Sequence, residues 1–258
     1  MFNILIDTSV WLDLAEPKQA PLLEPLAAML AGGQVDILVP CTVLTEFQAN
    51  RGRVAKSSEK SLSTHFGLVK DAVHKADGDK KQRDKVLAYL ADLDHAIPLI
   101  GGAAKANLDR IEAMLDAAVP IETSDAVKVR AADRALSRKA PCHLNKNSMA
   151  DAVLVETYFE CVKTGKAGDR FAFVTHNHID FSQLNGNRKL PHADIASGFS
   201  KIKSMYFITL TDCIKRVDPV YLQPEVMRAM GYELEPRSLS EMVDVMDGVP
   251  PARLLDFI

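Results

Sequence analysis

The sequence predicts an α/β fold with a mainly parallel sheet, and two observations lead to this prediction. Short apolar runs typical of buried strands alternate with segments of helical spacing; these runs lie at residues 2–6, 35–40, 171–175 and 206–210. Strand, helix, strand, helix, then helix, strand and strand is the order expected when helices connect parallel strands. Hydrophobic residues make up 47% of the 258, which allows a sizeable core.

The first two expected strands each lead to an acidic residue. The first strand stops on Asp7, which the polar pair Thr8-Ser9 follows. Hydroxyl side chains cap helices well, so we expect a helix to start here with Thr8 or Ser9 as its cap. The second strand leads into a helix that carries Glu46. Both acids therefore stand close to the carboxyl end of a strand.

The chain divides into a core, an insertion and a tail. The middle of the chain is charged and helical in spacing, with no strong strand pattern, whereas prolines become frequent after Pro219. We expect a domain at 1–217, with its core at 1–50 and 142–215 and a helical insertion at about 51–141, and a C-terminal helical tail at 218–258.

Several classes of protein are excluded by composition. The four cysteines are scattered without a C-x-x-C pair, so common zinc sites and a small disulfide framework are excluded, and reduced thiols are expected. The net charge of -3 gives no global nucleic-acid signature. No apolar run approaches the roughly 20 residues of a membrane helix. With no signal peptide recognised, we expect a cytoplasmic protein with no membrane partner.

Four acids are candidates for a site, and each has an ordinary structural explanation. Asp7 could cap a helix, and Glu46 could be a solvated helix residue. Asp151 stands three residues after Ser148, as in a capping box. Asp180 could be a turn residue. Taken one at a time, none of the four acids establishes a site.

Considered together, the four acids favour a cation site. All follow expected strands or begin helices, and the carboxyl ends of parallel strands form the ligand-binding edge of an open α/β sheet. Carboxylates that converge repel one another unless a cation neutralises them. Because oxygen ligands favour Mg²⁺ or Mn²⁺ over zinc, the sequence predicts a site for one of these hard cations.

These motifs resemble those of the PIN-domain family. The resemblance rests on DTSVW at 7–11, the helix with Glu46, SMAD at 148–151 and VTHNHIDF at 174–181, in the expected order. It covers residues 1–50 and 142–215. Two further features, the long insertion and the KLPHAD motif at 189–194, resemble a larger bacterial branch of the family. The resemblance implies a PIN-like three-layer α/β/α fold and a ribonuclease that depends on Mg²⁺ or Mn²⁺.

The resemblance also implies roles for individual residues. Asp7, Glu46 and Asp151 match the first three acidic positions of the family and are expected to be catalytic and to bind metal. Ser9 and Thr175 are expected to position water or a neighbouring carboxylate.

The fourth acidic position stays open between two residues. Many members have Asp where this chain has Asn177, and others have Asn there with Asp at the place of Asp180. We expect Asp180 to be the fourth catalytic and metal-binding acid. Asn177 can offer an uncharged oxygen to the metal.

Basic residues before the third acid are candidates for binding nucleic acid. Arg130, Arg134 and Arg138 recur every four residues, so on a helix they would share a face. Lys146 lies close in sequence to Asp151. We expect these four cations to contact phosphate. For the basic stretch at 51–85, a solvated helical surface explains the pattern equally well.

Two other functions stay open. One is a catalytically weak RNA-binding or scaffold protein with the PIN fold. The other is a Mg²⁺-dependent phosphohydrolase of small molecules, although its D-x-D-x-T motif is absent because Thr-Ser-Val follows Asp7. The implied partner is single-stranded or structured RNA; a toxin role would add a protein antitoxin, and a homo-oligomer stays open.

Overall fold

The fold is taken from a computed structural model of the chain. It describes residues 1–222 except 17, 76–78, 96 and 184–185, and at 58–63, 65–66, 92–101 and 221 it describes the backbone only. Residues 1–222 form one compact unit. The helical tail expected at 218–258 lies outside the described residues from position 223 onward.

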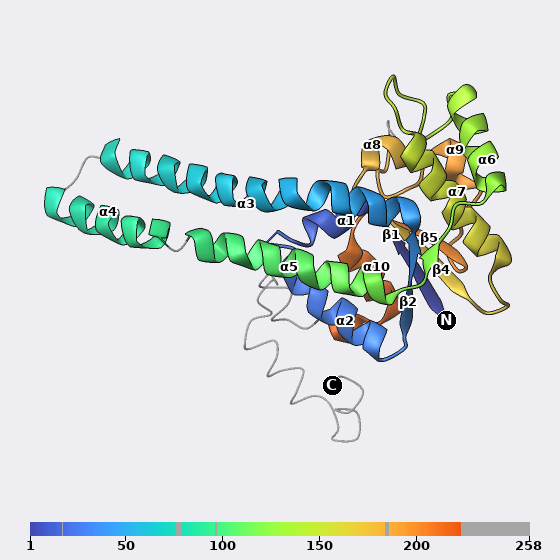
Figure 1. The fold of residues 1–258 in the computed structure, drawn as a ribbon, viewed down its shortest axis with the longest axis horizontal. Coiled ribbons are helices and arrows are strands. Elements are labelled where there is room, and N and C mark those ends of the chain that lie inside the picture. Colours follow the sequence, from blue (N-terminus) through green and yellow to red (C-terminus); the bar gives the residue numbers. More distant parts are fainter. Residues whose placement is uncertain (17, 76–78, 96, 184–185, 223–258) are drawn as a thin grey trace, which may run out of the picture. The chain divides into compact units, whose positions relative to one another are not determined.

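A five-stranded parallel sheet forms the centre of the fold, in the order β3-β2-β1-β4-β5 (Figure 1). Its strands are β1 (Phe2–Ile6), β2 (Val35–Pro40), β3 (Pro120–Ile121), β4 (Arg170–Val174) and β5 (Ser204–Phe207). All five residues of β1 are buried, because strands flank it on both sides and helices cover the sheet. The expected α/β/α fold with a parallel sheet is confirmed.

The short strand β3 corrects one expectation. The central stretch of the chain was expected to be helical throughout, but Pro120 and Ile121 pair with Val39 and Pro40 of β2. Two residues at the edge of a sheet leave no alternating pattern in the sequence, so periodicity could not reveal this strand.

Helices connect the strands. The α-helices are α1 (Thr8–Asp13), α2 (Leu23–Ala31), α3 (Cys41–Lys75), α4 (Lys80–His95), α5 (Ile97–Ala117), α6 (Asp125–Leu136), α7 (Met149–Thr164), α8 (His178–Phe181), α9 (Ala193–Ala196) and α10 (Leu210–Val217); the short 3₁₀ helices are η1 (Ala20–Leu22) and η2 (Pro219–Tyr221). Among the described residues, no helix combines the length and apolar character that a membrane span requires.

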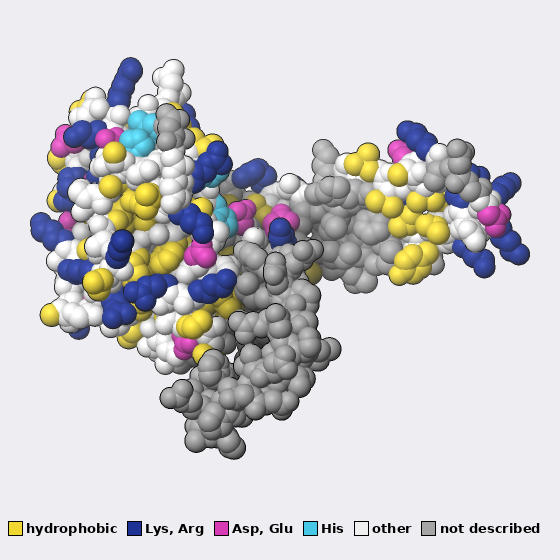
Figure 2. All heavy atoms as spheres, turned by 180° about the vertical axis from the view of Figure 1, so that it is seen from behind, with side chains coloured by type: hydrophobic (Ala, Val, Ile, Leu, Met, Phe, Trp, Pro, Cys, Tyr) yellow, Lys and Arg dark blue, Asp and Glu magenta, His cyan; other side chains and the backbone are white. Residues whose placement is uncertain are grey.

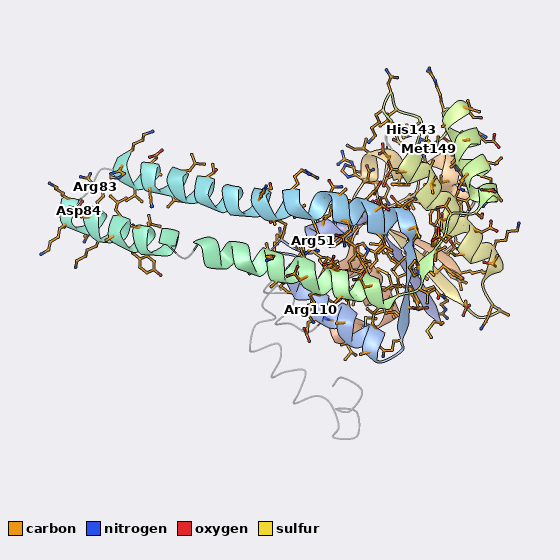
Figure 3. All side chains as sticks on the ribbon, viewed as in Figure 1. Arg51, Arg83, Asp84, Arg110, His143 and Met149 are labelled. Carbon is orange, nitrogen blue, oxygen red and sulfur yellow. The ribbon has the colours of Figure 1, made fainter. Side chains whose placement is uncertain are left out.

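The helical insertion continues a core helix. α3 runs on for 35 residues from β2, and α4 and α5 lie beside it in the opposite direction (Figure 1). Arg51 joins α3 to α5, because its guanidinium donates to Glu112 and forms an ion pair with Asp109 (Figure 3). One cation of the basic stretch at 51–85 is therefore bound to carboxylates of the neighbouring helix.

The pair of helices α3 and α4 also exposes apolar side chains. Figure 2 shows them on this part of the molecule together with Lys and Arg side chains; they include Leu68, Val69, Val86 and Tyr89. This surface is therefore mixed in character rather than uniformly basic.

The order of the strands places a switch point between β1 and β4. From β1 the chain builds β2 and then β3 on one side, and it returns to add β4 on the other side. Connections that leave in opposite directions open a crevice at the carboxyl ends of the two strands. Asp7, immediately after β1, donates its backbone N–H to the carbonyl of Val174 in β4 at 2.9 Å. The sheet thus holds Asp7 at this switch point.

Candidate active site

Asp7 is buried, with 4% of its surface exposed, and its carboxylate is held by two hydroxyl groups. Ser9 donates to Oδ2 of Asp7 at 2.7 Å, and Thr175, which follows β4, donates to the same oxygen at 2.6 Å. Because the two donors come from either side of the switch point, the orientation of the Asp7 carboxylate is fixed by the tertiary fold.

The expected cap of the first helix is wrong. α1 begins at Thr8 with Asp7 at the N-cap position, yet the Asp7 side chain makes no capping hydrogen bond. The hydroxyls of Thr8 and Ser9 both donate to carboxylates, and among the described residues neither accepts a capping hydrogen bond from the backbone of α1. Side chains that could have capped α1 are used to orient acids instead.

Glu46 extends from α3 towards the same crevice. Thr8 donates its hydroxyl to Oε2 of Glu46 at 3.0 Å. Burial raises the pKa of Glu46, the nearby charge of Asp7 raises it further, and the hydrogen bond from Thr8 acts in the opposite direction. The influence of Asp7 shows that the first two acids lie within electrostatic reach of each other.

Asp151 lies in the first turn of α7 and is coupled to the other acids. Burial is the largest cause that raises its pKa to about 7, followed by the charges of Asp7, Asp180 and Glu46, while Lys146 lowers it. The capping-box explanation does not hold, since Ser148 at the N-cap makes no capping hydrogen bond. Three acids from separate segments therefore act on the carboxyl group of Asp151.

Asp180 is fully buried and already has a cation beside it. Its Oδ2 accepts from Nδ2 of Asn177 at 2.7 Å and lies 2.5 Å from Nζ of Lys146, whereas its Oδ1 is buried and has no hydrogen-bond partner in the part of the chain that the structure describes. An unpaired buried oxygen on a carboxylate is costly unless a further donor or cation reaches it.

The acids border a pocket with a volume of about 400 Å³. Asp7, Glu46, Asp151 and Asn177 line it, whereas Asp180 does not. The two candidates for the fourth position thus differ in place: Asn177 faces the pocket, and Asp180 lies against it, bonded to the Asn177 amide.

Asn50, Arg53 and Asp13 also line the pocket, and none of them was expected at the acidic site, although Arg53 belongs to the basic stretch at 51–85. Asn50 and Arg53 extend the wall along α3, and Nη2 of Arg53 donates to Oδ1 of Asn50 at 3.0 Å. Their positions four and seven residues after Glu46 place them on the same helix face, a signal that was available in the sequence. Asp13, which ends α1, pairs with His176 at 2.6 Å.

The chemistry of these donors fits a hard divalent cation. Carboxylates and one amide oxygen are the ligands that Mg²⁺ and Mn²⁺ prefer, and the unpaired Oδ1 of Asp180 is one free oxygen of this kind. In the described part of the chain, no three Asp, Glu, His or Cys side chains are yet grouped closely enough to hold a metal. The carboxylates of Asp7, Glu46 and Asp180 are each turned to a donor of their own, so metal binding would require these side chains to converge.

The expected row of three arginines on one helix face is wrong. α6 ends at Leu136, so Arg138 lies beyond the helix, where its φ is 51°. Arg130 and Arg134 belong to α6, but both guanidiniums donate to Glu156 of α7. The four-residue spacing correctly placed Arg130 and Arg134 on one face of a helix. It could not show that the buried carboxylate of Glu156 binds both side chains on that face.

The cysteines agree with the expected reduced state. All four are free thiols; Cys213 is buried and Cys41, Cys142 and Cys161 are half-buried. Burial is the largest cause that raises the pKa of each of these thiols.

Fold and site together define an α/β protein with an acidic pocket at the switch point of a parallel sheet. The model of the PIN-domain family matches residues 4–181, which is more than half of the chain. The chain therefore belongs to the PIN-domain family, whose members are generally nucleases that use divalent metals. Comparison with curated proteins and comparison with solved structures each found no match.

Proposed function

We propose that this protein is a metal-dependent endoribonuclease that hydrolyses phosphodiester bonds of RNA. The observation that carries this proposal is that Asp7, Glu46 and Asp151, from three separate segments, line one pocket. Burial and the neighbouring acids also raise the pKa of Asp151 to about 7. Carboxylates that share one pocket repel one another, and a bound divalent cation would offset this repulsion. Membership of the PIN-domain family supports a nuclease in particular.

The residues would divide the work between binding and orientation. Asp7, Glu46, Asp151 and Asp180, with the amide oxygen of Asn177, would hold Mg²⁺ or Mn²⁺. When bound, the ion would supply Lewis-acid activation of water and charge neutralisation at the phosphate.

Neighbouring groups prepare the acids for this task. Ser9 and Thr175 fix the carboxylate of Asp7, and Thr8 fixes that of Glu46. With its pKa raised to about 7, Asp151 is partly protonated at neutral pH, and a bound proton must leave before the carboxylate can serve as a ligand.

Two cations next to the acids are suited to phosphate. Arg53 lines the acidic pocket, and Lys146 reaches Asp180 from the loop before α7. In this proposal Arg53, Arg138 and Lys146 contact the RNA backbone, and Arg130 and Arg134 do not.

The decisive experiment measures cleavage of end-labelled single-stranded RNA by the full chain with Mg²⁺, with Mn²⁺ and with EDTA. Wild type is expected to cleave only with metal, and Asp7→Asn is expected to lose this activity. Asp125→Asn is the matched control, because Asp125 is an exposed carboxylate on α6, far in sequence from the site. Equal cleavage by Asp7→Asn and wild type, or cleavage that EDTA leaves unchanged, contradicts the proposal.

One observation favours a second function, a catalytically weak RNA-binding protein with this fold. The ammonium group of Lys146 already neutralises Asp180, and Asn177 takes a pocket position that a carboxylate could occupy. RNA binding that persists in EDTA without any cleavage in Mg²⁺ or Mn²⁺ would select this function over the nuclease.

A further inference from the structure

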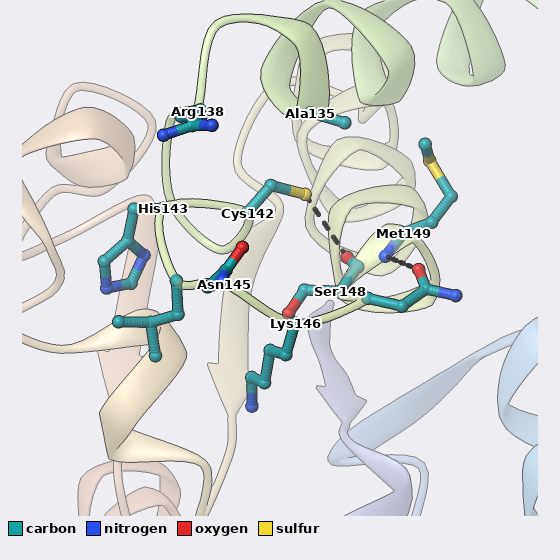
Figure 4. Close-up of a pocket in the computed structure, with 10 residues that line it drawn as sticks. Ala135, Arg138, Cys142, His143, Asn145, Lys146, Ser148 and Met149 are labelled. Carbon is teal, nitrogen blue, oxygen red and sulfur yellow. Dashed lines mark hydrogen bonds between the residues drawn. The ribbon is translucent and has the colours of Figure 1, made fainter.

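A second pocket lies beside the acidic centre, in the loop that joins α6 to α7 (Figure 4). Residues 138 and 142–149 form its wall together with Ala135. Its volume of about 760 Å³ falls in the range of roughly 300–1,000 Å³ that is usual for ligand sites. Lys146 belongs to this wall and also contacts Asp180, whose Oδ2 accepts a hydrogen bond from Asn177 in the wall of the acidic pocket.

The charge of this pocket favours an anion. Arg138 and Lys146 contribute cations, Asn145 and Asn147 contribute amides, and no carboxylate is among the lining residues. Across the described residues, the guanidinium of Arg138 has no ion-pair partner, in contrast to Arg134. A free guanidinium is well shaped to bind phosphate.

Unpaired polar atoms are concentrated in the same wall. Ser148 is 97% buried (3% exposed), and its Oγ has no hydrogen-bond partner among the described residues. Within the same part of the chain, neither ring nitrogen of His143 has one. Burial, and then the neighbouring His192, lowers the pKa of His143, so its neutral ring offers one donor and one acceptor. Buried polar groups normally find partners, and here a ligand can provide them.

We infer that this pocket binds one nucleotide of single-stranded RNA next to the bond that the acidic centre cleaves. The phosphate of this nucleotide contacts Arg138 and Lys146. Its base presents a hydrogen-bonding edge to Asn145, Ser148 and His143, which is how proteins read unpaired RNA bases. The inference rests on the proposed function, because it places RNA at the acidic centre.

Binding of fluorescein-labelled single-stranded RNA to the full chain, followed by fluorescence anisotropy in EDTA, tests this inference without cleavage. Arg138→Gly removes the cation at a position whose φ of 51° suits glycine. Asn145→Asp places a repelling carboxylate on an exposed part of the wall. Both variants are expected to weaken RNA binding by at least about fivefold.

Lys139→Ala is the matched control, because it removes an equal charge one position away and Lys139 does not line the pocket. Its RNA binding is expected to stay within about twofold of wild type. On the wild-type protein, RNA that contains 4-thiouridine should cross-link to residues 138–149, as mapped by mass spectrometry. This second readout does not depend on any variant folding.

The outcomes separate this inference from the proposed function. If wild type cleaves RNA but Arg138→Gly and Asn145→Asp bind as tightly as Lys139→Ala, the nucleotide pocket is wrong and the nuclease stands. If wild type does not cleave, yet both variants bind weakly and cross-links map to 138–149, the pocket stands and the nuclease is wrong. Cross-links that map only elsewhere overturn the pocket.

Discussion

Arg134 and Glu156 form an ion pair between α6 and α7, in which Nε of Arg134 lies 2.5 Å from Oε1 of Glu156. The side chains are 15% and 6% exposed, and Arg130 contacts the second oxygen of Glu156 at 2.7 Å. Since α7 also carries Asp151, this pairing fixes the helix that presents one of the site acids. The arginines of α6 therefore serve the architecture of the site.

Arg134→Met should lower the stability of the protein. Without Arg134, the buried negative charge of Glu156 is neutralised by Arg130 alone. We therefore expect a loss of about 2 kcal/mol in the free energy of unfolding. Urea denaturation with EDTA present measures it. Lys128→Met is the control, since its exposed pair with Asp125 should contribute less than about 1 kcal/mol. Equal losses in both variants would contradict this role for Arg134.

The pKa of Asp151 gives the stability a dependence on pH. The carboxyl titrates near 3.8 when exposed and near 7 in the folded protein, so between these values the folded state binds more protons than the unfolded state. The contribution of Asp151 to stability is therefore fully present below about pH 4 and is lost as the pH rises to about 7.

Asp151→Asn should flatten this part of the pH profile. Each pKa unit corresponds to about 1.4 kcal/mol, and we expect the variant to exceed wild type in stability by at least about 1 kcal/mol above pH 7 without metal. Urea midpoints between pH 4 and 8 test this. Parallel profiles for wild type and Asp151→Asn would show that Asp151 is not the coupled group.

Mn²⁺ should raise the melting temperature of the wild-type protein. Ligand that binds only the folded state stabilises it by about 2.7 kcal/mol at a concentration 100 times the dissociation constant. The shift should be larger at pH 8 than at pH 6, because the ion competes with the proton on Asp151. Differential scanning fluorimetry measures it. Asp7→Asn should reduce the shift and Asp125→Asn should keep it; no wild-type shift at millimolar Mn²⁺ argues against a metal site.

Arg51 and Arg53 should separate stability from RNA binding. Arg53 lines the acidic pocket, so Arg53→Ala should weaken RNA binding and reduce the slope of log affinity against log salt by about 1. Arg51 pairs with Glu112 and Asp109, so Arg51→Ala should lower the melting temperature and leave the salt slope unchanged. Anisotropy titrations at several salt concentrations measure this slope for both variants. An unchanged slope in Arg53→Ala would show that Arg53 does not contact RNA.

Two serines at helix starts should respond differently to alanine. Ser124 accepts a hydrogen bond from the backbone N–H of Val127 at 3.2 Å and caps α6, whereas Ser148 makes no capping bond at α7. Ser124→Ala should cost about 1 kcal/mol, and Ser148→Ala should cost clearly less. A comparable loss in Ser148→Ala would mean that its hydroxyl caps α7 after all.

Local sequence was enough to determine where the first two strands end and which acids follow them. The strand expected at 206–210 was placed too late, because β5 spans Ser204–Phe207 and α10 begins at Leu210. The apolar run before Asp7 and the helix that carries Glu46 depend on neighbours close in the chain, and patterns of this kind are readable from periodicity. The resemblance to PIN-domain motifs added the expectation that these acids belong to one site. The two-residue strand β3 and the capping of α1 could not be read in this way, because their partners are distant in sequence.

Only the tertiary structure decided which polar groups are free. Four-residue spacing in the sequence groups Arg130 with Arg134, yet Glu156, which lies 26 and 22 positions further along the chain, occupies both guanidiniums. Long-range pairing likewise sets Lys146 against Asp180, and within the described part of the chain it leaves Arg138 without an ion-pair partner. The charge of a residue, as read from the sequence, indicates only which kinds of group its side chain can bind. What it does bind depends on burial and on partners that folding brings beside it.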